Sequence, residues 1–160
     1  MKRRDLLLIP AAALGVMIAN VAISFGMVWV YSTFISPGRP LSDYQSFAAT
    51  AAPISSVVAG IPLMLLAGYL LARGRQERAA LLAAGAAALV YILLDLAILI
   101  GAHASGSVWV WAALSHATKL AAALAGAALA TRRTSPASAA AAPSAPLRPG
   151  TTHSAGTPRI

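Results

Sequence analysis

Hydrophobic residues fill four long runs along this chain, and polar residues are gathered between the runs. The runs extend over residues 6–34, 54–72, 79–102 and 108–131. An α-helix rises 1.5 Å per residue, so about 20 apolar residues are enough to cross a hydrocarbon core of roughly 30 Å. The pattern predicts an all-α integral membrane protein in which residues 1–133 form an up-down bundle of four transmembrane helices.

The first run follows a basic start, Lys2-Arg3-Arg4, as the apolar stretch of a secretory signal also does. A signal of that kind has an apolar stretch of only about 7–15 residues, followed by a small-residue cleavage site. Here the run continues through Phe25 and Trp29, and the candidate cleavage motif begins with the polar Asn20. The sequence therefore favours an uncleaved first span.

Composition agrees with this interpretation. The 160 residues are 59% hydrophobic and 10% charged, whereas a soluble domain carries about 25% charged residues. These values argue against a soluble enzyme domain. The chain has no cysteine, which excludes a disulfide scaffold, a thiol redox enzyme and a cysteine-ligated metal site.

The positive charges predict the orientation. The net charge is +8, but the basic residues cluster at the ends of the apolar runs rather than on one face, so nucleic-acid binding is not indicated. Basic residues favour the cytoplasmic side of a membrane. We therefore expect a multi-pass protein of a bacterial cytoplasmic (inner) membrane with both termini in the cytoplasm. In that orientation Arg39 faces outward, and the cytoplasmic side receives Lys2, Arg3, Arg4, Arg73, Arg75, Arg78, Arg132 and Arg133.

The longest connection joins the first two runs, from Ser36 to Pro53. It begins with the turn sequence at residues 37–40, which contains two prolines and a glycine. Ser42 followed by Gln45 has the pattern of a helix N-cap with a capping box. The sequence predicts a short interfacial helix that leads into the second span, either as a lid on the bundle or as a binding element.

Small residues recur every four positions in two of the runs. Lipid solvates Leu and Val well, so helices in a bilayer associate through close backbone contacts and polar contacts. The small residues form two ridges, Ala52-x3-Ser56-x3-Gly60 and Ala122-x3-Gly126-x3-Ala130. Each ridge predicts a surface at which a helix packs, inside the bundle, against a second copy or against another membrane protein.

Two charged residues lie inside apolar runs, Asp95 in the third and Lys119 in the fourth. A charge near the bilayer centre costs about 2.5–3.5 kcal/mol on insertion scales, so these side chains are not expected to face lipid. The short connection between the two runs makes their helices antiparallel neighbours. Asp95 is then within reach of Lys119, His116 or both.

Further polar residues fall at similar depths. Tyr91 lies one helical turn before Asp95, and Asn20 lies near the middle of the first run. The sequence thus predicts an intramembrane polar network of Asn20, Tyr91, Asp95, His116 and Lys119. Such a network can be structural and select which helices pack together. It can also be functional, as a proton, ion or small-solute site in the outer half of the bundle.

The sequence contains no recognisable catalytic or cofactor-binding pattern. His103 and His116 differ too much in depth to hold a haem between them, and together with Asp95 they lack a metal-site spacing. Ser115 and His116 are adjacent on a helix and point about 100° apart, which is unsuitable for a nucleophile and its base. We expect no catalytic residue, no cofactor and no metal.

Residues 134–160 are rich in Pro, Ala, Ser and Thr. They have too little apolar bulk to offset the entropy of ordering, so we expect a disordered cytoplasmic tail.

Two functional hypotheses follow from the sequence. The first is a small non-enzymatic accessory or interaction subunit, with membrane lipids and another membrane protein or a second copy as partners. The alternative is a proton- or ion-coupled transport or binding protein for a small solute that uses Asp95, Lys119 and His116.

Overall fold

The computed structural model describes residues 3–103 and 106–132. Four α-helices form this part of the chain, and a short π-helical segment, η1 (Tyr31–Ile35), continues the first of them. The helices are α1 (Arg3–Val30), α2 (Leu41–Ala72), α3 (Glu77–Gly101) and α4 (Gly106–Arg132). The described residues contain no strand, and all four helices are long and apolar enough to cross a membrane, as predicted. The predicted tail at 134–160 lies outside the described residues.

Three of the helices begin and end within a few residues of the predicted runs, but α2 does not. It is one continuous helix from Leu41, so the separate interfacial helix predicted before the second span is wrong. Pro53, which suggested a boundary, lies inside α2. A proline inside a helix removes one backbone hydrogen bond but need not end the helix. The helix begins after Pro40 without a side-chain cap, so the predicted N-cap role of Ser42 is also wrong.

The connection between η1 and α2 is short and tightly held. Gly38 has a φ of 74°, a left-handed conformation that glycine adopts without steric cost. The Tyr44 hydroxyl donates to the Ser36 carbonyl at 2.8 Å and accepts from the Arg39 backbone N–H at 3.0 Å. The Tyr31 and Phe47 rings stack with their centroids 3.9 Å apart. These contacts join the ends of α1 and α2 into a stable hairpin.

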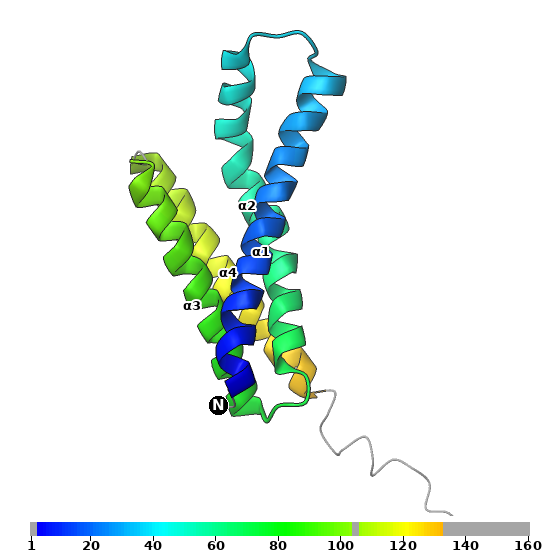
Figure 1. Ribbon diagram of the computed structural model, residues 1–160, viewed down its shortest axis with the longest axis vertical. Helices are drawn as coiled ribbons and strands as arrows, with labels where there is room; N and C mark the ends of the chain where they lie inside the picture. Colours follow the sequence, from blue (N-terminus) through cyan, green and yellow to red (C-terminus); the bar gives the residue numbers. More distant parts are fainter. Residues whose placement is uncertain (1–2, 104–105, 133–160) are drawn as a thin grey trace, which may run out of the picture.

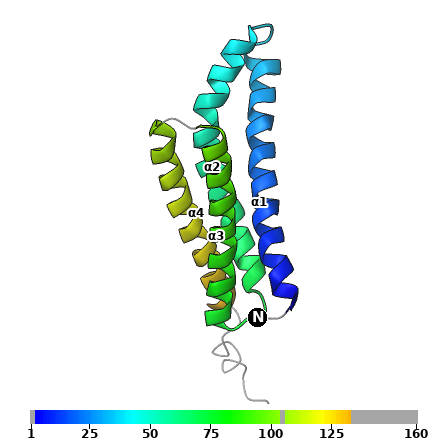
Figure 2. The same cartoon turned by 60° about the vertical axis from the view of Figure 1, so that its left-hand side comes forward.

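The four helices form two pairs. Figure 1 shows α1 beside α2 and α3 beside α4, with the pairs diverging toward the end opposite the N-terminus. Both views show α1 and α2 extending beyond the far ends of α3 and α4 (Figure 2). The pairs are joined along their other halves, where α2 and α4 make the most extensive helix contact among the described residues.

The α2–α4 contact depends on glycine. A Cβ at Gly68 would overlap the Ala123 carbonyl, and a Cβ at Gly126 would overlap the Leu65 carbonyl. The backbones of these two helices therefore touch without intervening side chains, as small residues allow. The surrounding core is built mainly from alanine, with Met64 and Tyr91 as its largest apolar contributors.

The predicted ridge on the fourth run lies in this contact. Ala122, Gly126 and Ala130 are all buried inside the chain. The ridge on the second run is used only in part, because Gly60 is buried but Ala52 is exposed. A partner that binds this protein would have to use a surface other than the α4 ridge.

We predict that Gly126→Ala destabilises the protein by about 1–3 kcal/mol, the typical cost of overpacking a tight contact. Thermal unfolding of the full chain in neutral detergent measures this effect. Gly15→Ala is the matched control, because a Cβ at Gly15 would meet nothing within 4 Å. Equal unfolding temperatures for the two variants would contradict a glycine-dependent contact.

Candidate functional site

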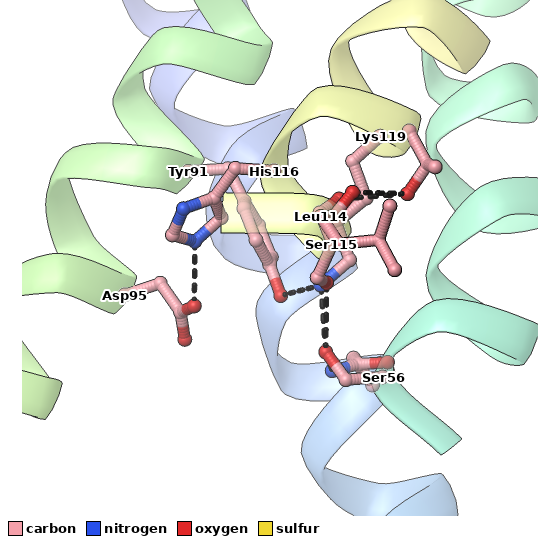
Figure 3. Close-up of polar contacts among 9 residues, drawn as sticks. Ser56, Tyr91, Asp95, Leu114, Ser115, His116 and Lys119 are labelled. Atoms are coloured by element: carbon pink, nitrogen blue, oxygen red, sulfur yellow. Dashed lines mark hydrogen bonds and ion pairs between the residues drawn. The ribbon is translucent and has the colours of Figure 1, made fainter. Parts of the chain in front are cut away.

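The five residues of the predicted network all lie along the middle of the helices. Asn20 comes from α1, Tyr91 and Asp95 from α3, and His116 and Lys119 from α4. All are buried except Asp95, which is half-buried. They do not form one chain of contacts, because Asp95 and His116 make one pair while Lys119 belongs to a separate group of hydroxyls (Figure 3).

Lys119 is the centre of the larger group. Its side chain is 0% exposed, and its ammonium donates to the Ser56 hydroxyl at 2.7 Å and to the Tyr91 hydroxyl at 2.8 Å. Among the described residues, no carboxylate lies within 4.0 Å of Lys119. A direct Asp95–Lys119 pair, one of the contacts suggested by the sequence, is therefore absent from this part of the chain. Hydroxyl oxygens accept the ammonium hydrogens instead.

Ser56 connects this group to the other helices. Its Oγ also accepts from Asn20 Nδ2 at 3.4 Å and lies 3.4 Å from Ser115 Oγ. Ser24 extends the group, since its hydroxyl lies 2.9 Å from that of Ser55. These four serines were not in the predicted network. A signal for them was present, because each is a hydroxyl in an otherwise apolar run that also carries Asn20, Lys119 or a small-residue ridge.

Gly60 makes room for the lysine. A Cβ at this position would overlap Lys119 Cε and would lie 3.3 Å from Cδ. Gly60 is one turn after Ser56 on α2, so the same helix face supplies both the acceptor for the ammonium and the space for the aliphatic stem.

Asp95 pairs with His116. Asp95 Oδ2 lies 2.8 Å from His116 Nε2, the distance of a strong hydrogen bond. An ionised carboxylate can only accept, so with Asp95 ionised the hydrogen of this contact is on the imidazole Nε2, in the neutral tautomer or in the imidazolium. The histidine side chain is 11% exposed, whereas the carboxylate is 29% exposed. The carboxylate therefore retains a face that another group can reach.

That face borders a pocket of about 360 Å³ between the diverging helix pairs. Among the described residues that line it, Asp95 is the one with a charged side chain, and Lys119 does not belong to this lining. Trp111 and Leu99 contribute aromatic and apolar surface. The polar lining residues are Asn20, Ser24, Ser56, Asp95 and Ser115.

Hydrogen-bond acceptors are in excess around this pocket. Asn20 Oδ1 is buried and receives no hydrogen bond from the described residues. Ala49 and Pro53 also line the pocket, and Pro53 has no N–H to donate to the Ala49 carbonyl one turn earlier. The Asp95 carboxylate, the serine hydroxyls of the lining and a backbone carbonyl without its usual donor suit a ligand that carries several N–H donors.

The described residues contain no group of three or more His, Cys, Asp or Glu side chains that could hold a metal ion. His103 lies in the turn after α3 with a φ of 51° and is not among the residues that line the pocket. The described lining of the pocket supplies one carboxylate and neutral groups, and the His116 imidazole is connected to it through the contact with Asp95.

Comparison with known protein families, with curated proteins and with solved structures finds no match for this chain.

We predict that Gly60→Ala destabilises the wild-type protein by about 1–3 kcal/mol, because the new methyl group displaces the Lys119 stem. In a Lys119→Ala background the displaced atoms are missing, so the same substitution should cost at least about 0.5 kcal/mol less. Thermal unfolding of the two single variants and the double variant measures this coupling. Gly26→Ala, where a Cβ meets nothing within 4 Å, serves as the control in both backgrounds. Strictly additive effects would contradict the Gly60–Lys119 contact.

Proposed function

We propose that the chain crosses a bacterial cytoplasmic membrane four times as an up-down bundle, with both termini in the cytoplasm. Its four apolar helices and the basic residues at the joined ends of the helices support this orientation. The pocket then lies in the outer half of the bundle, and the turn at residues 73–76 faces the cytoplasm.

Because the natural chain has no cysteine, its orientation can be tested with single introduced thiols. We predict that a cysteine in place of Ser42 reacts with a membrane-impermeant maleimide on intact spheroplasts. A cysteine in place of Gln76 should react only after the membrane is permeabilised. Ser42 is exposed in the first turn of α2, Gln76 is exposed in the connection between α2 and α3, and neither has a positive φ, so a cysteine is tolerated at both positions. The reverse labelling pattern would overturn the proposed orientation.

We further propose that the protein is a non-enzymatic binding or transport protein for a small cationic solute with an ammonium-type head. The observation that carries this proposal is the partly exposed carboxylate of Asp95, which lines the pocket inside membrane-length helices. An ionisable residue in such a position is costly and is usually functional. The pocket volume of about 360 Å³ suits a small organic molecule.

The arrangement of charges favours a cation over an anion. The Lys119 ammonium is held by Ser56 and Tyr91 and does not line the pocket. The pocket instead offers the Asp95 carboxylate and, among its lining residues, the aromatic side chain of Trp111. Aromatic faces attract cations through their quadrupole.

The Asp95–His116 pair provides coupling to protons. When His116 carries a second proton, its imidazolium neutralises the carboxylate across the 2.8 Å contact. A cationic solute that binds Asp95 supplies the same neutralisation. Proton and solute thus compete to neutralise the Asp95 carboxylate. Such competition is required of a protein that exchanges a proton for a cationic solute.

We predict that propylammonium raises the unfolding temperature of the detergent-purified full chain, while propionate of similar size does not. Binding should be tighter at mildly alkaline than at mildly acidic pH, because protons compete with the cation. Asp95→Asn should weaken binding at least about tenfold, the effect of losing one hydrogen bond to a charged group. Calorimetry in two buffers of different ionisation enthalpy measures both the affinity and the released proton.

Asp43→Asn is the matched control, because Asp43 lies outside the pocket and its carboxylate is 3.5 Å from Arg39. This variant should bind propylammonium like the parent. Undiminished binding by Asp95→Asn would refute the cation site. Binding that does not change with pH would refute proton coupling alone and leave the cation site standing.

A second candidate function, an accessory or interaction subunit, is favoured by the far end of the α1–α2 hairpin. This end extends beyond α3 and α4 (Figure 1) and carries the exposed side chains of Trp29, Phe34 and Leu41. Exposed apolar groups at such a position suit a contact with another membrane protein. A stable complex that persists through purification and is lost in Phe34→Ser, with no propylammonium binding by the parent, would favour this candidate.

A further inference from the structure

A second cavity lies in the other half of the molecule and has no part in the proposed cation site. It is a groove of about 520 Å³ between α1 and α2. On α1 its wall extends from Leu8 to Ala19, and on α2 from Leu63 to Leu71. Except for two arginines at one end, its lining consists of Leu, Ala, Val and Gly.

The groove has the length of an acyl chain in one leaflet. At 1.5 Å per residue, the distance along α1 from Leu8 to Ala19 is about 16 Å, and half of a hydrocarbon core is about 15 Å. Small residues on α1 create the hollow. A Cβ at Gly15 would meet nothing within 4 Å, so this wall is open at its centre.

The arginines lie where a lipid headgroup would be. Arg73 and Arg75 follow the last residue of α2 and line one end of the groove. The guanidinium group binds phosphate oxygens through two parallel hydrogen bonds. Arg78 adds a third positive charge nearby in sequence and Glu77 one negative charge, so residues 73–78 remain net positive, which disfavours a headgroup that carries its own cation.

We propose that this groove binds an anionic phospholipid, with one acyl chain along α1 and α2 and the phosphate on Arg73 and Arg75. Apolar contact along the groove supplies affinity for the chain, and the two guanidinium groups select the headgroup. This inference does not depend on the Asp95 pocket, which lies between different helix faces.

The test measures the unfolding temperature of the full chain in neutral detergent with added dioleoyl phosphatidylglycerol or dioleoyl phosphatidylcholine. A ligand that binds only the folded state raises this temperature as its concentration rises. We expect a larger rise with phosphatidylglycerol, and no rise with inorganic phosphate alone. In the double variant Arg73→Gln/Arg75→Gln, the rise with phosphatidylglycerol should fall to that with phosphatidylcholine, as apparent affinity weakens at least about tenfold.

Two further variants separate the headgroup from the chain. Gly15→Leu fills the open wall and should reduce the rise with both lipids, whereas Ala125→Leu, at an exposed position of α4, should leave it unchanged. Arg132→Gln removes an exposed charge outside the groove and should also have no effect. If the arginine double variant fails to fold, Arg73→Lys/Arg75→Lys replaces it and should retain only part of the preference for phosphatidylglycerol. Equal rises with the two lipids in the wild type, or an unchanged preference in the arginine variants, would overturn the proposal.

Discussion

The buried ammonium of Lys119 is the group on which the arrangement of this bundle depends. A charged group in a low-dielectric interior is tolerated only when its hydrogen-bond donors are satisfied. Here the acceptors are the hydroxyls of Ser56 and Tyr91, which come from two other helices. Since Gly60 also provides the space for the lysine stem, α2, α3 and α4 must keep one register for the charge to remain satisfied.

This arrangement leaves Asp95 available for function. If the Lys119 ammonium were paired directly with the Asp95 carboxylate, the two charges would neutralise each other inside the bundle. Instead the hydroxyls take the ammonium, and Asp95 shares one oxygen with His116 while its side chain remains 29% exposed at the pocket. The two helix pairs diverge toward the end opposite the N-terminus (Figure 1). The pocket lies between them, and the glycine contacts of α2 with α4 close the bundle toward the other end. The glycine contacts that pack the bundle and the proposed cation site at Asp95 thus lie in different halves of the same helices.

The helices themselves could be predicted from the sequence, because a run of apolar residues long enough to span a membrane is a strong local signal. The ionisable residues of the polar contacts could also be singled out, since such side chains in apolar runs are rare, but the serines that accompany them could not. Which of them touch could not be predicted, because this depends on the rotation and height of each helix. Those are decided by contacts such as that of Gly126 with Leu65, which no local pattern displays. For the same reason the sequence marks Ser56 only as a member of a small-residue ridge and not as a partner of Lys119. Pro53 suggested a boundary, but a proline removes one backbone hydrogen bond without having to end the helix, and α2 continues through it.

The position of the Lys119 ammonium can be measured directly by solid-state NMR in lipid bilayers. Lys2 and Lys119 are the two lysines of the chain, so Lys2→Arg leaves a single side-chain ammonium to label with ¹⁵N. Dipolar recoupling to ¹³C-labelled tyrosine or to the ¹³C carboxyl of aspartate then reports its neighbours. The account predicts strong coupling to the tyrosine ring and weak coupling to the aspartate carboxyl. The coupling to the ring should be lost in the Tyr91→Phe variant, in which the phenylalanine is not labelled. Strong coupling to Asp95 and none to tyrosine would contradict it.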